Sequence, residues 1–161
     1  STVCDLFSSL GGYSTSAYGA DGQTLTDDIL VYLMETLLES NVPQDGTWSI
    51  IGDPSTLADM LKIDKLLAAD YVSKKGAIEN GVIGHTIYGA VLRVTNNLTA
   101  ATTGAYAVML HPKAIASAAQ INKTWRKVFE ELPETRYQAE ALWGVIEAQD
   151  AFGIPFYTRK K

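Results

Sequence analysis

Cysteine, histidine and basic side chains are scarce in this chain, and each scarcity excludes a class of function. One cysteine, Cys4, is present among 161 residues, which excludes an internal disulfide and a cysteine-based zinc site of the usual spacing. The formal net charge is −5, and the only basic cluster is Arg159-Lys160-Lys161. Because phosphate backbones are held by clustered Lys and Arg, we expect no direct or specific binding to nucleic acid.

Long apolar runs are also missing. No run approaches the roughly 20 residues that span a bilayer, and residues 1–6 have neither the basic region nor the apolar core of a secretory signal. We therefore expect no membrane partner. With 47% hydrophobic residues the chain is nevertheless rich enough in apolar side chains to fold without disulfides or metals.

No constellation of catalytic or ligand-binding residues stands out. His85 and His111 lie in separate predicted elements, so they are expected to act as core or capping residues rather than as metal ligands. The glycines at residues 11–12 and 19–22 follow no predicted strand, which favours a loop over a phosphate cradle. The Gly-x-Ser-x-Gly pattern of a serine nucleophile does not occur. We expect no catalytic residue, no cofactor and no metal.

Helical signals are clearest in the first half of the chain. Thr24-Leu25-Thr26-Asp27-Asp28 places hydroxyls and carboxylates at the positive end of a helix. Pro43 predicts that this helix ends near Ser40-Asn41, and Asp53-Pro54 predicts a second helix over residues 54–62. A short third helix is expected after Asp64. The first helix carries an apolar stripe formed by Ile29, Leu30, Leu33, Met34, Leu37 and Leu38.

Strands are predicted between and after these helices. The segments at residues 47–51 and 105–110 predict short buried strands, and residues 81–95 predict a ribbon with a tight turn or a bulge at Tyr88-Gly89. His111-Pro112 predicts the start of a helix reaching residue 118. Further strands are expected over residues 121–131, 139–145, 146–149 and 154–157.

Two polar segments, residues 8–23 and 99–104, predict long loops that bury little. Residues 5–7 are expected to be a frayed end. Helices and strands mix without a βαβ rhythm or an internal repeat, so the predicted class is α+β.

Several segments, taken in order, resemble the C-terminal part of tailed-phage major capsid proteins. In that family a helix leads through an Asn-Val-Pro loop to a strand and a Pro-initiated helix, followed by a glycine-marked ribbon that ends in paired asparagines. The segments that carry the resemblance are Glu39-Ser40-Asn41-Val42-Pro43, Trp48-Ser49-Ile50-Ile51-Gly52-Asp53-Pro54, Asp70-Tyr71, Gly81-Val82-Ile83-Gly84, Val94-Thr95-Asn96-Asn97-Leu98, Val108-Met109-Leu110-His111-Pro112 and Trp143-Gly144-Val145.

This resemblance implies the tailed-phage major capsid fold, with an axial domain and part of a peripheral domain. It divides the chain into a loop-rich segment (1–23), a mainly axial domain (24–134) and peripheral strands with the C-terminus (135–161). The polar segments 8–23 and 99–104 are then candidates for contacts around the five-fold and six-fold axes. Family members carry an N-terminal arm, an extended hairpin loop and a spine helix before this region, so we expect a truncated or cleaved product.

The function implied by the resemblance is self-assembly into an icosahedral shell that encloses a DNA genome. The expected partners are other copies of the chain in pentamers and hexamers, with scaffolding or decoration proteins as further candidates. The expected location is the virion capsid, assembled in the host cytoplasm. Three alternatives stay open: an encapsulin-like compartment subunit, a small protein-interaction module, and a small enzyme that uses His85 or His111.

Overall fold

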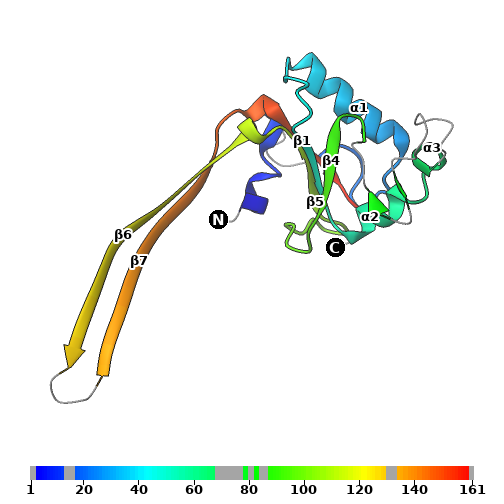
Figure 1. Cartoon of the computed structure of the whole chain (residues 1–161). Helices are drawn as coiled ribbons and strands as arrows, with labels where there is room; N and C mark the ends of the chain where they lie inside the picture. Colours follow the sequence, from blue (N-terminus) through cyan, green and yellow to red (C-terminus); the bar gives the residue numbers. More distant parts are fainter. Residues whose placement is uncertain are drawn as a thin grey trace.

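Figure 1 shows a folded body from which one long two-stranded ribbon projects. The computed structural model describes residues 3–12, 17–67, 78–79, 82–83, 87–129 and 134–159. Sheets predominate over helices in these residues, which confirms the α+β class. The helices are η1 (Val3–Leu6), η2 (Leu10–Gly12), α1 (Asp27–Glu39), α2 (Pro54–Met60), α3 (Asp64–Leu67), η3 (Pro112–Ala114) and η4 (Asp150–Phe152), with η marking 3₁₀ turns. The strands are β1 (Trp48–Gly52), β2 (Ile78–Glu79), β3 (Val82–Ile83), β4 (Ala90–Val94), β5 (Tyr106–Leu110), β6 (Ile115–Phe129), β7 (Glu134–Glu147) and β8 (Gly153–Tyr157).

Helix α1 begins and ends where the sequence predicts. Thr26 is its N-cap, although the Thr26 side chain makes no capping hydrogen bond. At the other end Asn41 adopts φ 57°, and the Val42 amide donates to the Leu37 carbonyl at 3.1 Å. This left-handed cap satisfies a carbonyl that the helix leaves free and turns the chain toward β1.

The body is built on a four-stranded sheet in the order β4-β1-β5-β8. Strands β1 and β4 are parallel, and the other two pairings are antiparallel. The parallel pair needs a crossover, which α2, α3 and the β2–β3 hairpin supply. The predicted turn before β4 is confirmed, since Tyr88 and Gly89 have φ angles of 49° and 80° and the Ile87 and Ala90 backbones are hydrogen-bonded to each other.

One face of this sheet, here called the helix face, carries the main core. Trp48, Ile50, Met109 and Phe156 are completely buried there against the part of the predicted α1 stripe that ends at Leu37. Leu38, predicted as a member of that stripe, is 41% exposed and lies outside the core. The Trp48 indole also donates to the Pro43 carbonyl at 2.7 Å, so its one polar atom is satisfied.

The opposite face is covered only in part. Phe7 and Leu10, from the N-terminal 3₁₀ turns, pack on Val108 and Leu110 over strands β5 and β8. Phe7 is 1% exposed and Leu10 is fully buried. The prediction that residues 5–7 are frayed and that the following loop buries little is therefore wrong for these two side chains.

The predicted helix after Pro112 is also wrong. Helical geometry there is limited to η3, capped by the His111 ring, whose Nδ1 accepts from the Lys113 amide at 3.1 Å. From Ile115 onward the chain pairs with β7, and long-range pairing overrides the helical propensity of the alanines at 116, 118 and 119.

The strands expected at residues 139–145 and 146–149 are one continuous strand, β7. The predicted boundary between residues 134 and 135 falls directly after the first residue of β7. The division into domains stays a prediction. In the described part of the chain, no helix has both the length and the apolar character needed to cross a membrane.

Candidate assembly surface

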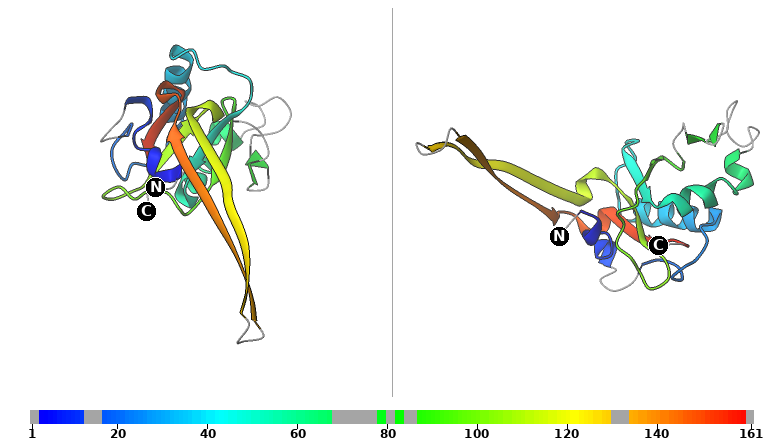
Figure 2. Two further views of the ribbon diagram at one scale, coloured as in Figure 1. Left: turned by 90° about the vertical axis from the view of Figure 1, so that its left-hand side faces the viewer. Right: turned by 90° about the horizontal axis from the view of Figure 1, so that it is seen from below.

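The β6–β7 ribbon is the largest feature outside the body. Its strands contain 15 and 14 residues and are paired from Ile115–Glu147 at the base to Phe129–Glu134 at the far end. At about 3.3 Å per residue it reaches about 45 Å. Figures 1 and 2 show it leaving the body as a slender twisted arm. An isolated pair of strands is marginal in water, so this length of ribbon calls for a partner surface.

The base of the ribbon is held by backbone hydrogen bonds. The amides of Ala148 and Gln149 donate to the Ala114 carbonyl at 2.8 and 3.3 Å. The Ser9 hydroxyl donates to Glu147 at 3.0 Å, which ties the N-terminal segment to β7. A hydrogen bond with Asp150, followed by partial burial, raises the pKa of Glu147. The direction in which the arm leaves the body is thus fixed by short contacts at residues 111–115 and 147–152.

Cross-strand register sorts the ribbon side chains into two faces. Residues directly opposite each other in an antiparallel pair share a face, and one bulge between Ile121 and Lys123 adjusts the register of β6. Arg126 lies over the Tyr137 ring at 5.9 Å, and these two residues are register partners. Lys123 lies over Trp125 at 5.6 Å on the other face.

The first of these faces, here called the apolar face, is mainly hydrophobic, with Ser117, Thr124 and Thr135 as its neutral polar members. Arg126 and Glu147 are its only charged side chains in the described residues, and Glu147 is at the base. Its larger apolar members are Ile115, Ile121, Val128, Tyr137, Trp143 and Val145.

The second face, here called the mixed face, changes character along its length. Near the base it carries Leu142 and Ile146, and farther out it carries Lys123, Lys127 and Glu140. Alternation of this kind is typical of a ribbon with one side against protein and one side partly in water.

Large side chains on the apolar face are strongly exposed. Ile121, Tyr137 and Trp143 have 70%, 74% and 62% of their surface accessible. Contiguous exposed patches of this kind mark protein–protein contact sites in soluble proteins. Aromatic side chains of this size are also the usual anchors of such contacts.

The two polar loops proposed for contacts around symmetry axes are tied to each other. The Asp21 carboxylate accepts from the amides of Thr103 and Gly104, both at 2.8 Å. Gly104 in turn lies so close to the C-terminal segment that an added Cβ would be 1.9 Å from the Thr158 carbonyl oxygen. The described parts of these loops therefore form one hydrogen-bonded cluster at the start of β5 and the end of β8. Contacts of this cluster with other subunits stay a prediction.

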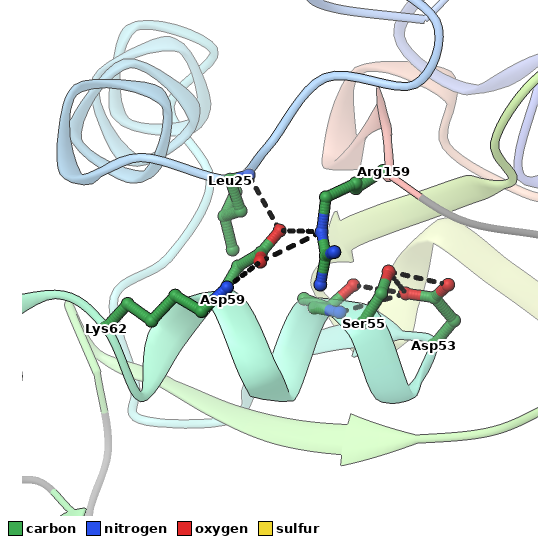
Figure 3. Close-up of polar contacts among 7 residues, drawn as sticks. Leu25, Asp53, Ser55, Asp59, Lys62 and Arg159 are labelled. Carbon is green, nitrogen blue, oxygen red and sulfur yellow. Dashed lines mark hydrogen bonds and ion pairs between the residues drawn. The ribbon is translucent and has the colours of Figure 1, made fainter.

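Asp59 connects three distant segments of the body (Figure 3). It lies on α2 and is 1% exposed. Its Oδ2 accepts from the Leu25 amide at 3.3 Å, and Arg159 Nε lies 3.1 Å from Oδ1. The start of the α1 segment and the end of the chain thus meet on one buried carboxylate, next to the Asp53 cap of the same helix.

Asp59→Asn is expected to lower the free energy of unfolding by about 2 kcal/mol. The asparagine side chain has the size of aspartate but lacks the negative charge that pairs with Arg159. Because Arg159 is half-exposed, the loss of stability is smaller than for a fully buried ion pair. Urea unfolding at pH 7 measures it. The matched control is Asp64→Asn, an exposed carboxylate at the start of α3, which should stay within about 0.5 kcal/mol. Equal effects of the two substitutions would contradict this role for Asp59.

Asp45 links the loop before β1 to the base of the ribbon. Its carboxylate accepts from the Thr47 hydroxyl at 2.6 Å and lies 3.3 Å from His111 Nε2. Because Nδ1 of His111 already accepts a hydrogen bond, its Nε2 carries the proton and donates to Asp45. The bond from Thr47, followed by that from His111, lowers the pKa of Asp45 to about 2.

The stabilisation by Asp45 is expected to disappear in acid. Its pKa is lower in the folded state than in the unfolded chain, so the contribution is complete above about pH 4 and is lost as the pH falls toward 2. Melting temperatures of the wild type and Asp45→Asn should therefore differ at pH 5 and converge near pH 2. In a Thr47→Val background, the difference in melting temperature caused by Asp45→Asn should be smaller over the same pH range. Parallel curves down to pH 2 would show that Asp45 is not responsible.

The residues weighed for chemistry do not come together. His111 is buried and caps η3, as expected for a structural histidine, whereas His85 lies outside the described residues. Cys4 is half-buried beside Phe7 and Leu10, and burial raises the pKa of its thiol. Among the residues that the structure describes, no group of three or more His, Cys, Asp or Glu side chains is arranged to hold a metal ion. The apolar face of the ribbon was missed because the start of β6 was predicted as a helix and β7 was predicted as two short strands.

Comparison with known proteins shows a likeness in fold to a phage protein. No family model matches the chain, and no curated protein does. A solved chain from Mycobacterium phage Che8 has a similar fold, with a TM-score of 0.62 and 20% sequence identity. The match covers 91% of this chain and 53% of the phage chain, so this chain spans about half the length of its structural neighbour. The fold described above therefore occurs in a phage protein.

Proposed function

We propose that this chain is a structural subunit of an icosahedral phage capsid, working through contacts between copies and without a catalytic step. The observation that carries the proposal is the ribbon, whose apolar face displays Ile121, Tyr137 and Trp143 to solvent. Exposed apolar patches of this kind mark contact sites, and a pair of strands without a further covering surface is only marginally stable.

The likeness in fold to the phage chain is a second observation that supports the proposal. Its fold is similar over 91% of this chain, and the match covers 53% of the phage chain. In the proposal, upstream residues of a longer subunit and neighbouring subunits together cover the ribbon. Many modest contacts then close into a shell, because linked weak contacts reinforce one another. The shell would enclose DNA and lie in the virion.

Light scattering coupled to size exclusion tests this proposal. The samples are this chain and the same chain extended at its N-terminus by its natural upstream sequence. We expect pentamers, hexamers or shells from the longer chain. Monomers of both chains across a range of salt and protein concentrations would contradict an assembly role.

A further inference from the structure

Helix α1 presents an unusual outer surface. Its sequence contains Asp27, Asp28, Glu35 and Glu39 and no basic residue. Asp27 is paired within the chain with Lys65 and Tyr88. Glu35 and Glu39 lie toward the C-terminal end of α1, where the helix dipole disfavours negative charge. A cation from another molecule would relieve this unfavourable arrangement.

Two exposed apolar side chains lie among these acids. Val31 is 38% exposed and Leu38 is 41% exposed. Together with Asp28, Glu35 and Glu39 they fall within about 100° of the helix circumference, on the side opposite the buried stripe. This outer stripe therefore combines apolar contact area with uncompensated negative charge, and it points directly away from the sheet.

A complementary surface lies on the other side of the body. The N-terminal turns cover β5 and β8 but leave the β1–β4 half of that sheet face open. There Val91 is 41% exposed, Arg93 is exposed, and Ile51 is half-buried beside Arg93. Arg93 has no ion-pair partner within the described ranges. The open half-face thus combines apolar area with one unpaired positive charge.

The distance between the apolar and the charged residue is similar on the two surfaces. Val31 and Glu35 are four residues apart on a helix, about 6 Å. Val91 and Arg93 are two residues apart on a strand, about 7 Å. When Glu35 lies opposite Arg93, Val31 falls opposite Val91, and Leu38 lies on the side of Ile51. A helix stripe on an open sheet face is also an ordinary packing arrangement.

We propose that the outer stripe of α1 in one copy docks on the open β1–β4 half-face of a second copy, with Glu35 paired to Arg93. Because the two surfaces are different and lie on opposite sides of the body, the contact is head-to-tail. Contacts of this type propagate into rings when the rotation closes. The contact joins only a few side chains on each copy, so a single contact is expected to be weak, because standard interfaces bury roughly 800 Å² per partner. The inference rests on the proposed function, for which it supplies a ring-forming contact.

Cysteine cross-linking tests the contact on this chain. In a Cys4→Ser background, Val31→Cys and Val91→Cys are combined, which leaves Glu35 and Arg93 in place. Mild oxidation at high protein concentration is expected to give a ladder of covalent dimers, trimers and longer chains on a non-reducing gel. The two single-cysteine chains, when mixed, should stop at dimers. A symmetric face-to-face contact would also stop at dimers in the double variant, and that result would overturn the proposal.

The charge pair is tested in the same background. Arg93→Glu should weaken the ladder about tenfold, and Glu35→Arg combined with Arg93→Glu should restore it. Val31→Cys paired with Lys113→Cys, an exposed position at the base of the ribbon, is the control for random collision. A ladder no stronger than this control, or one insensitive to Arg93→Glu, would refute the contact. If the longer chain forms shells while this ladder is absent, the inference fails and the proposed function stands.

Discussion

Replacing Ile121 and Trp143 with serine is expected to abolish assembly of the longer chain while leaving the fold of this chain intact. Both side chains lie on the apolar face of the ribbon and are 70% and 62% exposed. Covering them in an assembly contributes about 2 kcal/mol each, so their joint loss weakens association about a thousandfold. Light scattering of the longer chain measures assembly. Thermal unfolding of this chain should change by less than about 0.5 kcal/mol.

The matched control for this prediction lies on the mixed face. Gln120→Ser combined with Gln138→Ser changes one exposed residue in each strand, as the test variant does. Assembly should be retained. If both double variants assemble equally well, the apolar face is not a contact surface. Equal loss in both would point to general weakening of the ribbon.

Gly104→Ala is expected to be the most destabilising of the conservative substitutions considered for the body. The added methyl would be 1.9 Å from the Thr158 carbonyl oxygen and 3.0 Å from its carbon, and backbone atoms cannot move aside as a flexible side chain does. Overpacking of this kind costs about 3 kcal/mol. The melting temperature should fall by about 6–12 °C for a chain of this size.

Gly144→Ala is the matched control for that substitution. It makes the same chemical change, and nothing lies within 4 Å of the added Cβ on the exposed ribbon. Its melting temperature should match that of the wild type within about 2 °C. A comparable loss in both variants would mean that the close approach at Thr158 is not responsible.

Local signals were sufficient for much of the body. The carboxylates and apolar stripe before Ser40 predicted α1 to within a residue, and Asp53-Pro54 predicted α2 with its cap, which accepts from the Thr56 amide at 3.0 Å. These features depend on neighbours a few residues away, and sequence patterns record such neighbours directly.

Features that depend on distant partners were not predictable in the same way. Residues 115–119 carry alanines that favour a helix, and only the register with β7 makes them a strand. Leu10 sits in a glycine-rich segment and is buried because β5 and β8 leave room for it. The meeting of Leu25, Asp59 and Arg159 involves residues up to 134 positions apart, and no local pattern reports it.

The apolar face of the ribbon was not predicted, because the sequence placed the contacts between copies on the polar segments 8–23 and 99–104. The choice of face depends on the bulge between Ile121 and Lys123, which shifts the alternation of β6 by one residue. A bulge has no reliable signature in a single sequence. The division of charge along the ribbon therefore becomes visible only with the register.

The contacts of Asp59 stabilise the body and do not extend to the arm, so the body and the arm are expected to differ in local stability. Because Asp59 joins the entry to α1, helix α2 and the segment after β8, amide protons across the sheet should exchange with solvent only through opening of the body as a whole. Within the described residues the arm has two strands and no covering layer. Its amides should therefore exchange through local opening that requires little free energy and leaves the body folded. In the proposed assembly, the arm would become ordered on contact with a neighbouring copy, and the free energy of each new contact would stabilise the arm without disturbing the sheet.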